Sequence, residues 1–307
     1  MFSYIVRRLA VAIPTILILV TISFVLMWSA PGSPFMGEKL PPPEVMAALE
    51  AKYGLDQPYW KQYLDYLSNV IFHFDFGPSF KFKDRTVNDI IAQGFPVTLT
   101  YGFWSFIVAV VCGVGLGVTA AIRHNTWLDY LSVGFAIGSQ SIPNYVMAPI
   151  LVLVFTLWLG WLPGGGWEGG TWDHIIMPVI ALSTSYFASI ARITRSSMLE
   201  VLNSGFIRTA KAKGLPMSRV IFKHALKPAL LPVLSYLGPA FVGMVTGSVI
   251  IDQYFSTGGI GQFFVNSAFN RDYSTMMGIT ILVGTLTIIF NLLVDVLYAW
   301  IDPKIRY

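Results

Sequence analysis

Six long apolar runs, almost free of charged residues, constrain this chain more than any other feature of its sequence. A helix needs roughly 20 apolar residues to cross about 30 Å of hydrocarbon, and each run is long enough. Only 12% of the 307 residues are charged, whereas a soluble domain averages about 25%. The composition excludes a soluble enzyme, a disordered chain and a nucleic-acid-binding protein. It predicts an all-helical integral membrane protein.

The first run follows two arginines, as a signal peptide does, but its apolar stretch is longer than the usual ~7–15 residues. We therefore expect it to be retained as a helix. The last run contains one acid, Asp295. The six predicted spans cover residues 9–30, 95–122, 131–159, 174 to between 192 and 198, 228–251 and 275–300.

Basic residues are distributed unevenly between the connecting segments. With the N-terminus placed in the cytoplasm, the inner segments hold 13 basic and three acidic residues, and the outer segments hold 7 basic and 12 acidic residues. Short cytoplasmic loops of membrane proteins carry an excess of Lys and Arg. We therefore expect both termini, residues 1–8 and 302–307, to be cytoplasmic.

The outer segment 31–94 is too long for a simple connection. It contains three consecutive prolines at 41–43, a helical spacing of apolar residues after them, and an aromatic stretch from Tyr59 to Tyr66. This apolar and aromatic content is too high for a disordered linker. We expect a small folded cap here rather than a spacer, followed by a membrane core over residues 95–301.

The inner segment from Arg192 to Lys227 carries eight basic residues and one acid. Placing eight such charges in lipid would cost roughly 20–28 kcal/mol, so the segment is predicted to be cytoplasmic. Residues 206–216 predict a short helix capped by Gly214, with Pro216 in the first turn of a second helix. A basic amphipathic segment could rest on lipid headgroups, but the small residues at the joint favour a protein partner.

The run 210–214, Ala-Lys-Ala-Lys-Gly, resembles the "EAA" loop of bacterial ABC importer permeases, and residues 206–232 are similar to that loop in the peptide-importing branch. The resemblance implies a type I permease with six transmembrane helices in the bacterial inner membrane. It also implies four kinds of neighbour: a second homologous permease, two ABC ATPases that bind ATP and Mg²⁺, an extracytoplasmic peptide-binding protein, and membrane lipid. Further similar motifs lie at 4–9, 30–34, 74–79, 161–167, 270–273 and 294–307.

The same resemblance assigns the cytoplasmic loop 199–227 to coupling with an ATPase. Arg208 stands where the family usually has Glu, so a contact specific to Glu does not transfer. Another small substrate, such as a nickel chelate, glutathione or a murein peptide, is the alternative within the class. The expected ATPase contacts are Arg208, Thr209, Ala210, Gly214, Leu215, Pro216, Met217, Val220, Ile221 and Phe222.

A second family motif, at residues 252–261, departs from the usual pattern, because Asp252 replaces Glu and Gly258 replaces Pro. We expect a more flexible loop here. Asp252, Gly259 and Gly261 are candidates for an outer gate or a contact with the binding protein.

The sequence contains no Gly-Lys pair, which an ATP-binding P-loop needs. We therefore expect no catalytic residue and no cofactor on this chain. Asp295 is interpreted as a helix-end contact, because an ion-gradient-driven secondary carrier, the alternative from another class, usually places several ionisable groups in its helices. All four histidines lie in loops or at helix edges, which argues against an intramembrane protease and against a metal site.

Polar residues inside the predicted spans are candidates for lining a peptide pathway. Pro143 would kink the third span and free a carbonyl group. Helix packing is the alternative for Ser and Thr, and we assign Gly113, Gly115 and Gly117 to packing. The lining candidates are Gln140, Ser141, Pro143, Asn144, Ser185, Ser189, Thr246 and Ser248.

Overall fold

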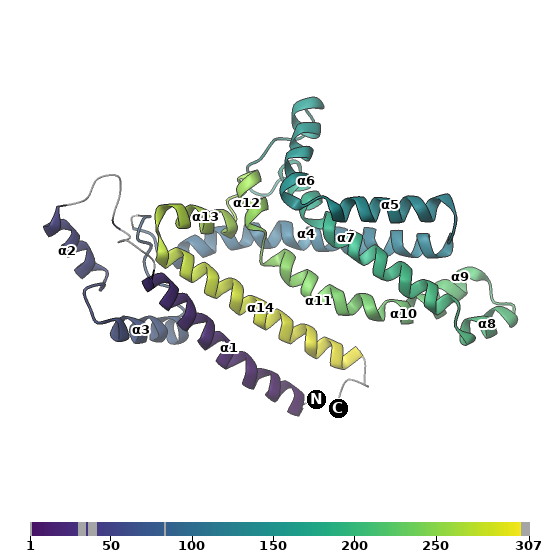
Figure 1. Ribbon diagram of the computed structural model, residues 1–307, viewed down its shortest axis with the longest axis horizontal. Coiled ribbons are helices and arrows are strands. Elements are labelled where there is room, and N and C mark those ends of the chain that lie inside the picture. Colours follow the sequence, from purple (N-terminus) through teal and green to yellow (C-terminus); the bar gives the residue numbers. More distant parts are fainter. Residues whose placement is uncertain (1, 30–34, 36–41, 83, 302–307) are drawn as a thin grey trace.

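The fold is described from a computed structural model that covers residues 2–29, 35, 42–82 and 84–301 (Figure 1). These residues form helices, and their one strand-like feature is an isolated antiparallel bridge between Pro78 and Thr86. The all-helical prediction is confirmed. The helices are α1 (Phe2–Ser29), α2 (Pro43–Lys52), α3 (Tyr59–Ser68), α4 (Val87–Ile122), α5 (Trp127–Ser141), α6 (Asn144–Leu151), α7 (Trp172–Leu202), α8 (Gly205–Ala212), α9 (Met217–Arg219), α10 (Leu226–Ala229), α11 (Leu231–Val245), α12 (Val249–Phe255), α13 (Ile260–Asn270) and α14 (Tyr273–Ile301), with π-helical stretches η1 (Asn69–His73), η2 (Val152–Trp158) and η3 (Val220–Ala225).

Four helices, α1, α4, α7 and α14, are each long and apolar enough to cross a membrane. Two further apolar segments are bent: α5 turns by 103° into α6 and η2, and residues 217–229 turn by 55° into α11. The described residues therefore provide four straight spans, or up to six if each bent pair counts as one. The side chain of Asp295 lies outside the described part, so its role stays a prediction.

Backbone chemistry explains why two predicted spans are interrupted. The third span breaks at Ile142, whose extended conformation (φ −92°, ψ 111°) is the one that a residue before proline prefers, and Pro143 then caps α6. In the fifth predicted span, α11 ends at Val245 rather than near Ile251, because Gly247 adopts a left-handed conformation with φ +90°. The predicted kink at Pro143 is therefore present, as a full break.

The centre of the fold is the close pair of α4 and α7, which run alongside each other in Figure 1. Within its most apolar window α7 is 78% buried, against 22% for the corresponding windows of α1 and α14. A Cβ atom added to Gly113 would lie 2.7 Å from Ile190, and one added to Gly117 would lie 2.5 Å from the Ala191 carbonyl oxygen. Gly115 faces open space, so two of the three glycines are packing contacts.

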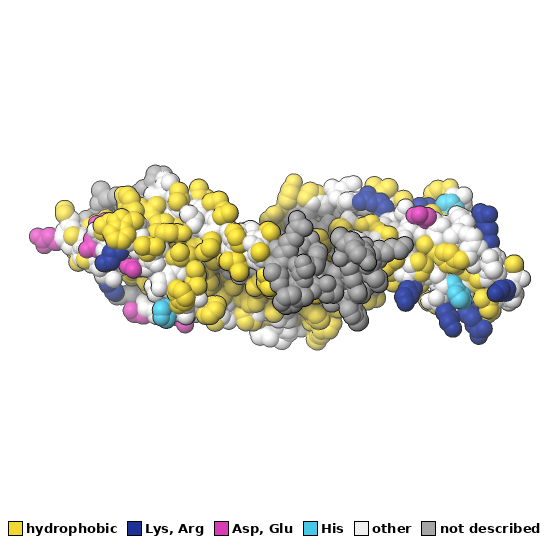
Figure 2. Space-filling view, turned by 90° about the horizontal axis from the view of Figure 1, so that it is seen from below, with side chains coloured by type: hydrophobic (Ala, Val, Ile, Leu, Met, Phe, Trp, Pro, Cys, Tyr) yellow, Lys and Arg dark blue, Asp and Glu magenta, His cyan; other side chains and the backbone are white. Residues whose placement is uncertain are grey.

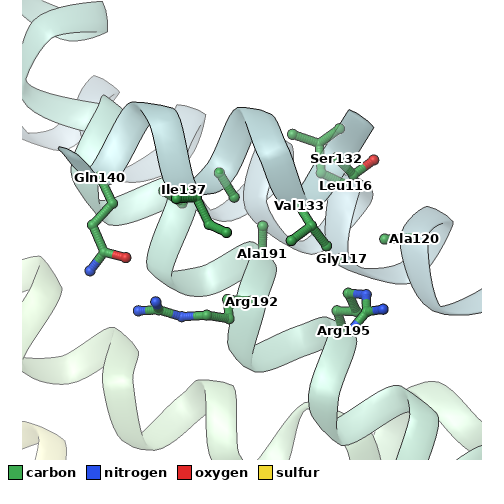
Figure 3. Close-up of a pocket in the computed structure, with 12 residues that line it drawn as sticks. Leu116, Gly117, Ala120, Ser132, Val133, Ile137, Gln140, Ala191, Arg192 and Arg195 are labelled. Carbon is green, nitrogen blue, oxygen red and sulfur yellow. The ribbon is translucent and has the colours of Figure 1, made fainter. Parts of the chain in front are cut away.

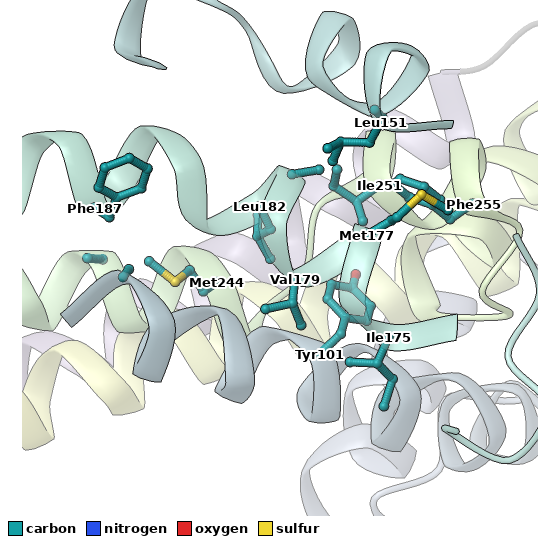
Figure 4. Packing of buried hydrophobic residues seen from close by; sticks show 14 of the residues in the cluster. Tyr101, Leu151, Ile175, Met177, Val179, Leu182, Phe187, Met244, Ile251 and Phe255 are labelled. Atoms are coloured by element: carbon teal, nitrogen blue, oxygen red, sulfur yellow. The ribbon is translucent and has the colours of Figure 1, made fainter. Parts of the chain in front are cut away.

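The main apolar cluster joins α4, α7 and α11 with α6 and α12 (Figure 4). Tyr101, Leu182, Met244 and Phe255 are among its fully buried members. Because residues from five helices meet here, the two bent segments are fixed against the central pair.

The segment between α1 and α4 contains α2 and α3, which lie at one end of the molecule (Figure 1). Phe24 of α1 packs edge-on against Tyr63 of α3, with ring centroids 5.3 Å apart. α4 then begins at Val87, before the predicted start of the span at residue 95. Thr86 and Asp89 form a capping box there, in which each side chain bonds to the other residue's backbone N–H.

The two ends of the molecule differ in charge. Figure 2 shows Asp and Glu side chains gathered at the end formed by α2 and α3, and Lys and Arg side chains gathered at the end formed by α8 and α9. Hydrophobic side chains cover much of this face between the two ends. The distribution matches a chain whose middle part is surrounded by lipid.

Candidate functional site

The basic end of the molecule is a helix–turn–helix loop between α7 and α11. α8 ends at Ala212, and Gly214 follows with φ +73°, a left-handed conformation that suits glycine after a helix. Pro216 is the N-terminal cap of α9, one residue before the helical position expected for it. The predicted pair of short helices is therefore present, with the second one continuing through η3 into α10.

One face of this loop packs against the chain itself. Ile207, Val220 and Ile221 are buried in a small apolar cluster with Ala121 of α4 and Met198 of α7. This packing joins the loop to the ends of the central helix pair. Val220 and Ile221 are thus turned inward, away from any surface that another chain could contact.

The opposite face is exposed and combines large apolar side chains with cations. Phe206 is 53% exposed, Met217 45% and Phe222 69%. Large apolar groups exposed in a polar neighbourhood are typical of a protein–protein contact. Of the ten expected ATPase contacts, Arg208, Thr209, Gly214, Pro216, Met217 and Phe222 are exposed, Ala210 and Leu215 are half-buried, and Val220 and Ile221 are buried.

A buried ion pair lies near this loop. The Arg195 guanidinium of α7 donates two hydrogen bonds to Asp129 of α5, with Nε–Oδ1 2.6 Å and Nη2–Oδ2 2.8 Å. Asp129 also accepts from the Asn125 backbone N–H at 3.0 Å and pairs with His124 at 3.1 Å. Because 66 residues separate Arg195 from Asp129, no local pattern predicts the pair.

The 252–261 motif forms a compact network at the other end of α11. Asp252 is fully buried and accepts hydrogen bonds from the Thr98 hydroxyl (3.2 Å), the Gly261 backbone N–H (3.0 Å) and the Thr257 hydroxyl. Thr98 also accepts from the Ile260 backbone N–H at 3.0 Å. The structure therefore holds this loop tightly where we expected flexibility, and Asp252, Gly259 and Gly261 are all buried.

Asp272 holds a second network at the same end. It accepts hydrogen bonds from the Ser79 hydroxyl (2.5 Å), the Phe80 backbone N–H (3.0 Å) and the Thr275 hydroxyl (2.8 Å). Because Ser79 precedes α4 and Asp272 precedes α14, this carboxylate joins the segment before α4 to the α13–α14 turn. The motif at residues 270–273 by itself predicts no such role for Asp272.

The predicted lining residues differ in their hydrogen bonds and their exposure. The hydroxyls of Ser189, Thr246 and Ser141 donate hydrogen bonds to carbonyl groups of their own helices, and the Ser248 side chain caps α12. Gln140, Ser141 and Pro143 are exposed, whereas Asn144, Ser185, Ser189, Thr246 and Ser248 are half-buried.

A groove of about 800 Å³ lies between α4, α5, α7 and η2, and Phe135, Ser139, Phe155 and Thr184 are among its lining residues. A second cavity, of about 230 Å³, lies between α4, α5 and α7 and includes Gln140, Arg192 and Arg195 in its wall (Figure 3). Among the described residues no group of three or more His, Cys, Asp or Glu side chains is placed to hold a metal ion.

A helical membrane protein with a central packed pair, an interrupted span on either side and an exposed basic loop at one end is a transport permease in its architecture. The chain belongs to the family of binding-protein-dependent transport system inner membrane components. The family model matches residues 113–307, and the model of the family's N-terminal region matches residues 1–102.

Curated relatives and solved structures agree with this assignment. The chain is 60% identical over 307 residues to the oligopeptide transport system permease protein OppB of Salmonella typhimurium, and all of both chains is covered. It is 42% identical over 306 residues to the dipeptide transport system permease protein DppB of Bacillus subtilis, covering 100% of this chain and 98% of that one. A structure of the inward-facing MetNI methionine ABC transporter shares the fold, with TM-score 0.59 at 18% identity, over 70% of this chain and 97% of that chain.

Proposed function

We propose that the chain is the permease subunit of an ATP-driven oligopeptide importer in a bacterial inner membrane. It forms half of the pathway beside a second homologous permease, works with an extracytoplasmic binding protein, and neither binds ATP nor catalyses a reaction. Full-length similarity to permeases named for oligopeptide and dipeptide transport supports the substrate class. Family membership supports the need for a binding protein.

The end formed by α8 and α9 faces the cytoplasm in this proposal, and the end formed by α2 and α3 faces outward. The gathering of Lys and Arg at the first end and of Asp and Glu at the second supports this orientation (Figure 2). In Figure 1 the first residues of α1 and the last residues of α14 lie at the ends of these helices that point away from α2 and α3, which supports a cytoplasmic location for both termini.

The exposed face of the loop, defined by Arg208, Met217 and Phe222, is the docking surface for an ATPase. The 69% exposure of the Phe222 side chain is the observation that carries this assignment. An aromatic side chain that fills a pocket on a partner contributes more to binding than the residues around it. The buried face of the same loop then transmits the ATPase motion to the ends of α4 and α7.

Alternating access follows from this connection. ATP and Mg²⁺ are bound by the partner ATPases, whose closure displaces the loop. Because Val220 and Ile221 pack with Met198 of α7, the displacement moves the central pair and opens the outer side of the pathway. A peptide released by the binding protein then enters from that side.

Reconstitution tests the function directly. The chain is purified with the second permease, the two ATPases and the binding protein encoded beside it, and is placed in proteoliposomes. We expect uptake of labelled peptides of two to eight residues that requires ATP. Uptake that continues without ATP and collapses with the proton gradient would identify a secondary carrier instead. Uptake of a nickel chelate or glutathione, with no uptake of peptides, would select the alternative substrates.

A further inference from the structure

We propose that Arg192 and Gln140 bind the C-terminal carboxylate of a peptide in the inner part of the pathway, while the last side chain of the peptide enters the cavity beside them. This inference rests on the proposed function and adds a position where the substrate is held. Both residues belong to the wall of the 230 Å³ cavity between α4, α5 and α7.

Of the two arginines in the cavity wall, Arg192 is the one without a partner among the described residues. Its neighbour Arg195 is paired with Asp129 through two hydrogen bonds and also contacts His124, whereas Arg192 is exposed and forms no ion pair or side-chain hydrogen bond within the described chain. The Gln140 side chain, also exposed, has no hydrogen bond within the described residues either. A guanidinium and an amide N–H are both donors, so an incoming carboxylate would satisfy them together.

The direction of the Arg192 side chain distinguishes a residue that faces a pathway from one that faces a lipid surface. An arginine near a membrane–water interface normally extends toward water at that interface. Figure 3 shows the Arg192 guanidinium pointing the other way, along α5 toward the Gln140 amide, while Arg195 points toward the α4 end that carries Ala120. Gln140 lies 13 residues beyond Trp127, the first residue of α5, or about 20 Å deeper along the helix. A charge directed to that depth requires water or a polar ligand.

Apart from Ser132 and the paired Arg195, the remaining wall of the cavity is apolar. Leu116 of α4, Ala136 and Ile137 of α5, and Ala188 of α7 contribute to it. A carboxylate with an attached apolar side chain is the chemistry that fits a cation and an amide at the mouth of such a cavity. In the C-terminal residue of a peptide, the carboxylate and the side chain are both attached to the α-carbon.

Paired peptide probes test the inference in the complete reconstituted importer. The measurement is the ratio of ATP-driven uptake of trialanine to that of trialanine amide, which lacks the carboxylate. Arg192→Gln is expected to lower this ratio about three- to tenfold, as the loss of one charge-assisted hydrogen bond in a wet site predicts. Arg192→Lys keeps the charge and is expected to retain most of the ratio.

Arg123→Gln is the matched control, because Arg123 is an exposed cation of the α4–α5 connection, outside the cavity. It is expected to leave the ratio unchanged. If Arg192→Gln fails to assemble, Gln140→Ala replaces it, with an expected two- to threefold fall (about one neutral hydrogen bond).

Three outcomes would overturn the inference. The ratio stays unchanged in both cavity variants, or it falls equally in the control, or uptake of the two peptides falls together and only in vesicles that contain phosphatidylglycerol. The last outcome would assign Arg192 to an anionic lipid. If the unaltered complex takes up neither peptide, the proposed function fails and this inference fails with it.

Discussion

The two polar ends of this molecule use their charged residues in opposite ways. At the end opposite the basic loop, the carboxylates of Asp252 and Asp272 are buried and accept several hydrogen bonds each from the same chain. At the basic end, the cations of the loop are exposed, beside exposed Met217 and Phe222. Charged groups that are hydrogen-bonded within their own chain stabilise its structure, whereas exposed charged groups without such bonds are available to bind a partner. The two aspartate networks therefore stabilise the fold, whereas the exposed groups of the loop are free to take part in the docking proposed above.

Removing a buried carboxylate should have the largest effect on stability. Asp252→Ala leaves Thr98, Thr257 and the Gly261 N–H without their acceptor, so we expect a loss of about 3–5 kcal/mol in the free energy of unfolding. The measurement is thermal unfolding of the purified chain in detergent. Asp56→Ala, at an exposed outer position, should change the midpoint little. Equal midpoints for the two variants would contradict a structural role for the network.

The central pair that joins the two ends should respond next most strongly. Gly117→Val places methyl groups against the Ala191 carbonyl oxygen, and overpacking of this kind costs about 1–3 kcal/mol. Gly115→Val, two residues away and facing open space, should be tolerated. The same unfolding measurement compares them. A destabilised Gly115→Val beside a stable Gly117→Val would show that α4 and α7 pack through a different face.

A backbone change in the inner loop should have a smaller effect. Gly214→Ala forces a side chain into a left-handed conformation, at a cost of about 1–2 kcal/mol. Gly205→Ala, in the first turn of α8 without positive φ, is its control and should be neutral. Proteolysis of the loop is the measurement. Equal cleavage rates in both variants would count against a required turn at Gly214.

A change at Phe222 should have the smallest effect on stability and the largest effect on assembly with the ATPase. Phe222→Ala removes an exposed side chain, so the free energy of unfolding should change by less than about 0.5 kcal/mol. ATPase retention during purification and peptide-stimulated ATP hydrolysis should both fall sharply. Val220→Ala, at a buried neighbour, should instead destabilise the chain. Full ATPase activity in Phe222→Ala would move the docking surface elsewhere on the loop.

Local patterns predicted local features well. Apolar runs located α1, α4, α7 and α14, and the Gly214–Pro216 pair located the turn between α8 and α9, because each depends on residues close in sequence. The breaks within the third and fifth predicted spans are harder to predict from the sequence. Pro143 predicted the first break. The angle of 103° between the two halves of that span is set by packing of α6 on α7 and α12, which no local pattern contains.

Long-range contacts account for what the sequence analysis missed. The bond from Thr98 to Asp252 joins residues 154 apart, and the bond from Ser79 to Asp272 joins residues 193 apart. A lone Thr in an apolar span gives no sign of such a partner. Arg192 was assigned only to the inner charge excess, because its lack of a partner becomes visible only when Arg195 and Asp129 are seen together.

The unbroken course of α7 has a mechanical consequence. This helix has 31 residues and is therefore about 46 Å long, enough to pass from one face of a bilayer to the other. Its last residue, Leu202, lies three positions before α8, and its first turn lies beside the outer segment that precedes it. The helix is continuous although Pro178 lies within it, and a small tilt of a helix of this length displaces its ends by several ångströms. In the proposed mechanism, a tilt of α7 would therefore displace both of its ends together, one on each side of the membrane.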